Sequence, residues 1–155
     1  MRTMLALLML AGCSGEDPCV DGDSSLTIGT GETAFEALEG EVLAHFGPQG
    51  GYHLFGSLQA SGLWDGGNSA VLRGTTPRVQ FRATAGDHEA GYGPRARTFD
   101  ATDSGTIEMV GDLLIWSTND PEDLDGLDVD IEASVTDNCG VTVSQSWSGT
   151  LGIAP

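Results

Sequence analysis

The chain has 155 residues, with 23 acidic residues against six arginines, no lysine, and a formal net charge of −17. Hydrophobic residues make up 39 % of it, which is enough for the core of one small domain. The charge argues against nucleic acid as a partner, and against electrostatic binding to anionic lipid, because both need cationic side chains.

The first twelve residues predict a secretory signal peptide. Arg2 gives a positive start, and an unbroken apolar run follows over residues 4–11. This run is too short for a transmembrane helix, which needs about 20 residues. Residues 10–13 read Leu-Ala-Gly-Cys, which resembles the lipobox of bacterial lipoproteins. An ordinary signal peptide followed by an incidental cysteine is the alternative.

The lipobox resemblance implies that Cys13 carries a diacylglyceryl group, that residues 1–12 are removed, and that the new amino terminus is acylated. Several acyl chains attach a protein stably, so the lipid bilayer is an expected partner. Ser14 follows the cysteine, with no aspartate there, which by the same resemblance implies the outer membrane of the cell envelope. Residues 13–24 are polar and turn-rich and predict a tether, leaving residues 25–155 as the folded domain.

Lipidation of Cys13 leaves Cys19 and Cys139 as an even pair. In an oxidising compartment this pair is expected to form a disulfide. It would close a loop of about 120 residues and add up to about 5 kcal/mol of stability in the loop-entropy model. A metal or redox pair is the alternative, although the chain has no Cys-x-x-Cys and no histidine near either cysteine.

From residue 25 on, short segments of alternating apolar and polar residues are separated by Gly, Asn, Asp and Pro. The alternation predicts strands with turns at 111–112 and 137–140, the strands covering residues 26–28, 52–60, 78–83, 107–109, 113–116, 128–135 and 141–147. About seven to nine such strands predict an all-β fold, an antiparallel two-sheet sandwich of the immunoglobulin-like kind.

Residues 33–46 fit two interpretations. Thr33 and Glu36 have the spacing of a helix capping box, and an apolar helical face would follow them. Gly40 instead favours a turn between two short strands, because glycine costs a helix about 1 kcal/mol. The sequence favours the strands without excluding the helix.

Residues 47–53 (Gly-Pro-Gln-Gly-Gly-Tyr-His) contain the first candidate binding residues, Gln49 and His53. The segment resembles a Gly-x-Gln-Gly-Gly-x-His stretch of secreted proteins and lipoproteins of Gram-negative bacteria, some with immunoglobulin-like domains. No activity is implied by this resemblance. The alternative is a tight loop in which Gln49 caps backbone groups and His53 lies on the solvent face of a strand.

Residues 119–126 form an acidic turn that contains Asp120, Asp123 and Asp125. Alternating acids copy part of a calcium-binding loop, so these three residues are candidates for a weak Ca²⁺ site. The full calcium-loop spacing with its terminal glutamate is absent, and a solvated turn is the alternative. No other cofactor is expected.

Asp128, Asp130 and Glu132 are predicted to lie on one outward strand face, where like charges repel. Arg78 and Arg82 form an outward basic strand face, so we expect the two strands to be neighbours, with Arg95 and Arg97 as alternative partners of the acidic face.

The tryptophan and histidine residues are expected to have structural and not catalytic or metal-binding roles. Trp64, Trp116 and Trp147 are expected to be anchors of the sandwich, with a sugar platform as the alternative. The three histidines lack the spacing of zinc ligands, and His88 is expected in a solvated turn.

No catalytic constellation is visible in the sequence. We therefore expect a lipid-anchored envelope protein, not an enzyme, whose β-sandwich binds an envelope protein or glycan or supports an assembly. One alternative is a Ca²⁺-dependent adhesion or sugar-binding domain. Another is a small hydrolase of envelope polysaccharide, which would need a pair of carboxylates at glycosidase spacing.

Overall fold

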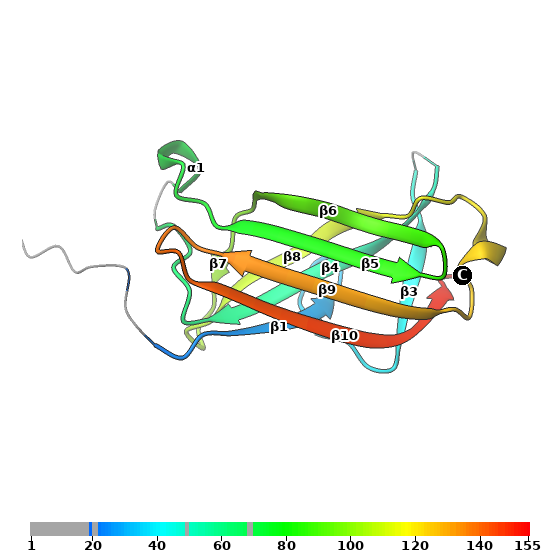
Figure 1. Ribbon diagram of the computed structural model, residues 1–155, viewed down its shortest axis with the longest axis horizontal. Coiled ribbons are helices and arrows are strands. Elements are labelled where there is room, and N and C mark those ends of the chain that lie inside the picture. The colour runs from blue at the N-terminus through cyan, green and yellow to red at the C-terminus, as the bar shows by residue number, and fades with distance from the viewer. Residues whose placement is uncertain (1–18, 20–21, 49, 68–69) are drawn as a thin grey trace, which may run out of the picture.

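The computed structural model describes residues 19, 22–48, 50–67 and 70–155, and its ten strands form two packed layers (Figure 1). The α-helix among these residues, α1 (Ala70–Arg73), has four residues. Within the described part of the chain, no helix is long and apolar enough to cross a membrane.

The first sheet has the order β2-β1-β4-β8-β7, and every pair in it is antiparallel. Its strands are β1 (Ser25–Thr30), β2 (Glu36–Ala37), β4 (Tyr52–Ser61), β7 (Asp100–Ala101) and β8 (Ile107–Ile115).

The second sheet has the order β3-β10-β9-β5-β6. Its strands are β3 (Glu41–Phe46), β5 (Arg78–Ala85), β6 (His88–Ala96), β9 (Asp128–Thr136) and β10 (Thr142–Ile153). Strand β3 runs parallel to β10, which departs from the purely antiparallel prediction, and its last two residues pair with the start of β4. It therefore connects the two sheets along one side of the sandwich.

Strands β1-β4-β8-β7 and β10-β9-β5-β6 have the order of the A-B-E-D and G-F-C-C′ strands of immunoglobulin domains. The all-β, immunoglobulin-like sandwich predicted from the alternation is thus confirmed. Strand β7 has only two residues, which is why the alternation did not reveal it.

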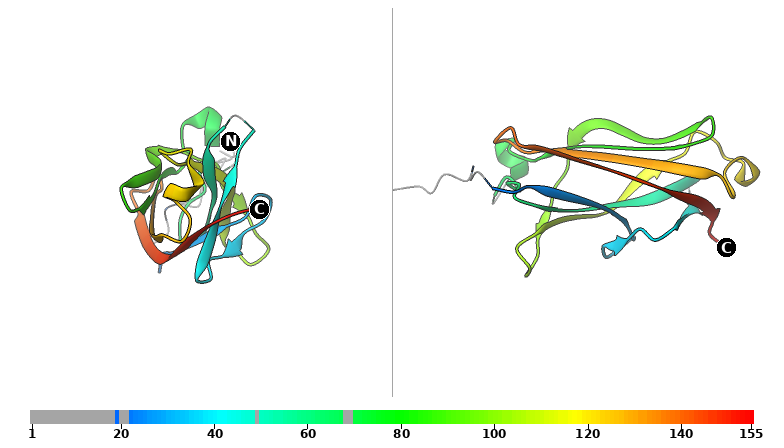
Figure 2. Two further views of the ribbon diagram at one scale, coloured as in Figure 1. Left: turned by 90° about the vertical axis from the view of Figure 1, so that its right-hand side faces the viewer. Right: turned by 60° about the horizontal axis from the view of Figure 1, so that its bottom comes forward.

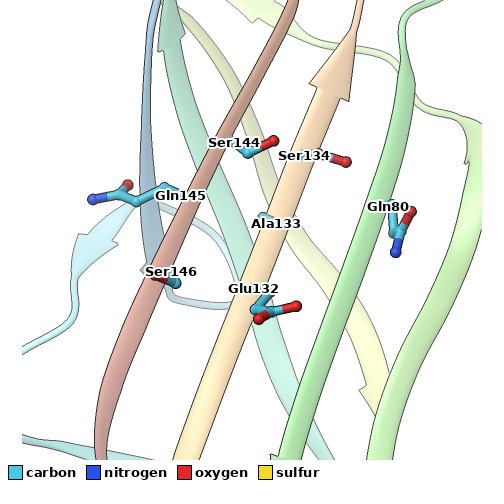
Figure 3. Close-up of a pocket in the computed structure, with 7 residues that line it drawn as sticks. All are labelled: Gln80, Glu132, Ala133, Ser134, Ser144, Gln145 and Ser146. Atoms are coloured by element: carbon cyan, nitrogen blue, oxygen red, sulfur yellow. The ribbon is translucent and has the colours of Figure 1, made fainter.

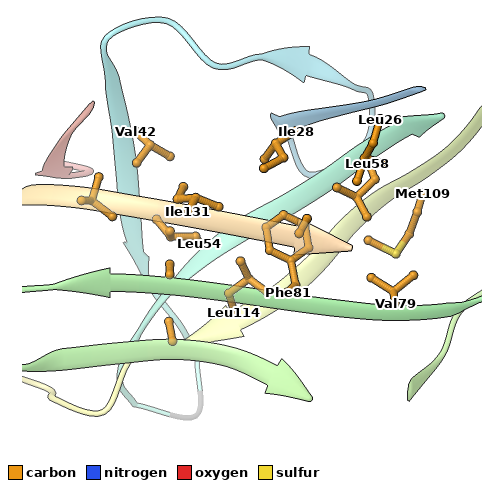
Figure 4. Packing of buried hydrophobic residues seen from close by; sticks show 14 of the residues in the cluster. Leu26, Ile28, Val42, Leu54, Leu58, Val79, Phe81, Met109, Leu114 and Ile131 are labelled. Atoms are coloured by element: carbon orange, nitrogen blue, oxygen red, sulfur yellow. The ribbon is translucent and has the colours of Figure 1, made fainter. Parts of the chain in front are cut away.

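The core lies between the sheets and is centred on Phe81 of β5 (Figure 4). Phe81, Leu54, Leu58 and Leu114 are each at most 1 % exposed. A Cβ at Gly56 of β4 would lie 3.0 Å from the Phe81 ring and 3.1 Å from Leu114. Glycine at this position therefore makes room for the Phe81 ring.

The predicted turn at residues 111–112 is wrong, because residues 107–115 form one continuous strand, β8. The pairing with β4 shifts between Gly56 and Leu58, so Gly111 lies in a β-bulge with a positive φ of 72°. Ser57 holds the bulge: its Oγ accepts a hydrogen bond from the Gly111 N–H at 3.2 Å and donates to the Gly31 carbonyl at 3.1 Å.

Residues 33–46 form strands β2 and β3, and the predicted turn at Gly40 joins them with a φ of 66°. The helix interpretation is wrong. The prediction for His88 is also wrong, because His88 begins strand β6 and its Nε2 lies 4.0 Å from Asp123.

The chain enters the sandwich at one end, beside α1 and the β9–β10 hairpin, and leaves it at the other (Figures 1 and 2). At the entry end the predicted disulfide joins Cys19 to Cys139, with the Cα atoms 5.4 Å apart. Asp137 fixes the hairpin there, since its carboxylate accepts hydrogen bonds from the backbone N–H groups of Trp64, Cys139 and Val141 at 2.9–3.0 Å.

Candidate functional site

His53 lies at the start of β4, between His45 of β3 and Ile115 of β8. It lies on the outer face of β4, as the alternation predicts, but only 9 % of it is exposed, so the alternative of a solvated histidine is wrong. The Gly47 backbone covers it: a Cβ at Gly47 would come 3.1 Å from the His53 Nδ1. Gln49, predicted to act with His53, lies outside the described residues.

Aromatic rings surround the His53 imidazole. Its centroid is 4.9 Å from that of Phe55 and 6.2 Å from that of His45. Burial lowers the pKa of His53, the neighbouring His45 lowers it further, and Glu32 opposes both effects. The site therefore favours an uncharged imidazole at this position.

An apolar surface surrounds this histidine on the outer face of the first sheet. We call it the β3–β4–β8 patch: Leu43, His45, Phe55, Leu113 and Ile115. Phe55 of β4 lies directly opposite Leu113 of the neighbouring strand β8. The ring centroids of His45 and Phe55 are 5.1 Å apart. Leu43, Leu113 and Ile115 are 40 %, 45 % and 63 % exposed. Contiguous exposed apolar side chains of this kind mark interaction surfaces.

A groove of about 450 Å³ runs along the β3 side of the patch. We call it the glutamate groove, because Glu32, Glu36, Glu39 and Glu41 line it together with Leu43, His45 and Phe55 of the patch. All four glutamates are exposed. The site thus combines an apolar floor with a negatively charged rim.

A second groove, of about 410 Å³, lies on the outer face of the second sheet over β5, β9 and β10 (Figure 3). Its polar lining comes from Gln80, Glu132, Ser134, Ser144, Gln145 and Ser146. These hydroxyl, amide and carboxylate groups offer hydrogen bonds, and Ala133 is the apolar residue of the lining.

The acidic face of β9 lies beside the basic face of β5, as predicted, with Arg82 directly opposite Glu132. The Arg82 guanidinium, however, pairs with Glu89 of β6. Asp130 accepts a hydrogen bond from the Ser148 hydroxyl at 2.6 Å. The strands are neighbours, but the Arg82 ion pair is with β6 and not with β9.

The candidate calcium residues have structural contacts. Asp120 caps the short 3₁₀ helix η1 (Pro121–Asp123) by accepting a hydrogen bond from the Glu122 N–H at 3.0 Å. Asp123 accepts a hydrogen bond from the Thr118 hydroxyl at 2.8 Å. Among the residues the structure describes, no three His, Cys, Asp or Glu side chains gather as a metal site, Asp125 included.

The sequence missed a polar cluster that joins the two sheets on the side away from β3. Asp112 of β8 accepts hydrogen bonds from the Tyr92 hydroxyl and from two guanidinium nitrogens of Arg97, one of them at 3.1 Å. Arg95 stacks over the Tyr92 ring, with its Cζ 3.3 Å from the centroid.

Burial and the hydrogen bond to Asp112 raise the pKa of Tyr92, and the same aspartate raises that of Arg97. A single aspartate inside an apolar run was the only sequence signal of this cluster.

The tryptophans serve the fold. Trp116 is 3 % exposed, and Trp147 packs against the core from β10. Trp64 lies in the loop after β4, where its backbone N–H reaches Asp137. The predicted lipidation site, Cys13, lies outside the described residues.

No protein-family model and no curated protein matches the chain. Among solved structures, murine CRIg aligns over 86 % of this chain and 100 % of its own, with 12 % sequence identity and a TM-score of 0.35. A similarity this low carries no argument, so the immunoglobulin-like assignment rests on the strand order described above.

Proposed function

We propose that this chain is a lipid-anchored envelope protein whose immunoglobulin-like sandwich binds another envelope protein without catalysing a reaction. The anchor is Cys13 of the lipobox-like segment, and the localisation is the outer membrane. The Cys19–Cys139 disulfide supports an oxidising compartment, because disulfides persist there and are rare in the cytosol.

The β3–β4–β8 patch carries the binding part of the proposal. Specific interfaces have an apolar centre within a polar rim, and the exposed Leu43, Leu113 and Ile115 beside the acidic groove provide both. Ser61 at the far end of β4 pairs with Ser25, where the domain begins. Phe55 lies six residues along β4 from Ser61, about 20 Å at 3.3 Å per residue. The patch is therefore well separated from Ser25, where the folded domain begins.

Intact mass spectrometry of the membrane-extracted protein tests the anchor. We expect the mass of an acylated Cys13 together with a Cys19–Cys139 cystine. A free thiol at Cys13, in protein that does not sediment with membranes, would refute the anchor.

Photo-crosslinking in intact cells tests the binding surface. With a photo-reactive amino acid in place of Leu113, we expect a discrete crosslinked product with a second envelope protein. The same substitution at Ser146, on the outer face of the other sheet, is the matched control. Equal crosslinking from both positions, or none from Leu113, would contradict the proposal.

The polar groove of Figure 3 favours a second candidate function, the binding of an envelope glycan through hydroxyl and amide groups. Calorimetry with envelope polysaccharide fragments, with and without Ca²⁺, tests it. We expect the heat of binding to disappear in a Gln80→Ala variant. An unchanged heat in that variant, or no heat with the native protein, would exclude this groove as a glycan site.

A further inference from the structure

We infer that the glutamate groove and the β3–β4–β8 patch together bind a basic, apolar segment of a partner polypeptide. The inference rests on the proposed function and names the class of its partner.

The four glutamates of the groove are uncompensated. None of Glu32, Glu36, Glu39 and Glu41 forms an ion pair with any side chain in the described part of the chain. Arg82, Arg95 and Arg97 are already paired with other acids, and the chain has no lysine. A ligand that brings cations to this rim therefore relieves repulsion that the fold itself leaves in place.

The spacing of these carboxylates suits a polypeptide better than a metal ion. They come from the loop after β1, from β2, from the following turn and from β3, and they do not converge as a metal site among the described residues. Dispersed charges match arginine or lysine side chains spaced along a chain.

The apolar floor of the site indicates that the ligand also carries apolar groups. Val42 beneath the groove is 3 % exposed, while Leu43 and Leu113 stand at 40 % and 45 % exposed on either side of Phe55. Burying these side chains requires apolar groups on the partner, interleaved with its cations. A metal ion or a small inorganic cation would leave them in water.

Charge also decides between occupants of this surface. A second copy of the chain would bring the same four glutamates, and the same net charge of −17, against the rim. An anionic lipid surface would be repelled for the same reason. A basic polypeptide segment is the occupant that the charges favour.

Fluorescence anisotropy with the full-length acylated protein in nanodiscs of zwitterionic lipid tests this inference. The probe is a short labelled peptide in which arginine alternates with valine, with empty nanodiscs as the blank. A peptide with glutamate in place of each arginine is the control for apolar binding. We expect the arginine peptide to bind and the glutamate peptide not to bind. The affinity for the arginine peptide is expected to fall about tenfold when salt screens the charges of the groove.

Two charge-neutralising double variants distinguish the contribution of the groove to peptide affinity from that of the overall negative charge of the chain. Glu39→Gln with Glu41→Gln is expected to weaken binding of the arginine peptide about tenfold. Asp128→Asn with Glu132→Gln removes the same charge from the outer face of the other sheet, and is expected to leave the affinity unchanged. Leu113→Ser, checked for folding by circular dichroism, is expected to weaken binding without altering its dependence on salt.

Equal binding of both peptides, or equal losses in the two double variants, would overturn the inference. If Leu113 crosslinks to an envelope protein but the arginine peptide does not bind, the partner class is wrong while the proposed function stands. Crosslinking only to a second copy also overturns the partner class. If neither experiment gives binding, both proposals fall.

Discussion

Replacing Asp112 with alanine tests whether the polar cluster between β6 and β8 holds the two sheets together. The Asp112 side chain is 17 % exposed and that of Arg97 is 27 % exposed, so water reaches the pair only partly. The substitution removes the acceptor of the Tyr92 hydroxyl and of two Arg97 nitrogens. It also leaves the half-buried Tyr92 hydroxyl without this partner.

The expected loss follows from these contacts. A hydrogen bond to a charged group contributes about 1.5–3 kcal/mol, and a polar group left unsatisfied inside the protein costs about 1–3 kcal/mol. Because water can rehydrate part of the Arg97 guanidinium, we expect Asp112→Ala to lower the free energy of unfolding by about 3 kcal/mol. For a domain of this size that corresponds to a fall in Tm of roughly 10 °C.

Chemical denaturation of Asp112→Ala, Arg97→Met and the double variant measures this effect. We expect a coupling energy between the two residues of about 1–2 kcal/mol. The control is Asp125→Asn, on an exposed side chain, which should change the stability by less than about 0.5 kcal/mol. If Asp112→Ala behaves like this control, the cluster does not stabilise the sandwich and the reasoning is wrong.

Three further effects on stability are expected. Cys139→Ser, or reduction of the native protein, should lower the Tm measured by calorimetry, with a loss of up to about 5 kcal/mol because the unfolded chain regains a long loop; an unchanged Tm would refute this. Since the pKa of His53 is lowered in the folded protein, the stability it contributes is present above about pH 6.5 and is lost as the pH falls, so urea denaturation at pH 7 and pH 5 should differ less in His53→Gln. The pKa of Tyr92 is raised, so its contribution is present below about pH 10 and is lost as the pH rises further. Tyr92→Phe should flatten that alkaline fall in thermal melts, and the same steep fall in the variant would contradict the assignment.

Local alternation was enough to predict strands β4, β5 and β9. In β5 and β9 every second side chain is buried, so the period of two in the sequence reports directly on the sheet. The hairpin at residues 137–140 and the turn at Gly40 were predicted for the same local reason. Strand β6 was missed because residues 88–96 contain two glycines and a proline and show little alternation.

His53 shows where a local pattern is insufficient. Alternation correctly put it on the outer face of β4, yet the backbone at Gly47 and the neighbouring rings bury it. Gly111 is similar, since a glycine followed by an aspartate has the composition of a turn, and only the pairing with β4 makes it a bulge. The cause in both cases is a segment that is close in space, which a local window cannot contain.

The sequence by itself determined the acidic charge, the lipobox-like residues 10–13 and the alternating strands, because each depends on residue type or short spacing, and it predicted the Cys19–Cys139 disulfide from the cysteine count. Only the tertiary structure decided that β3 runs parallel to β10, that Asp112 joins β6 to β8, and that four glutamates gather beside an exposed apolar face. Those arrangements arise when strands far apart in the chain become neighbours.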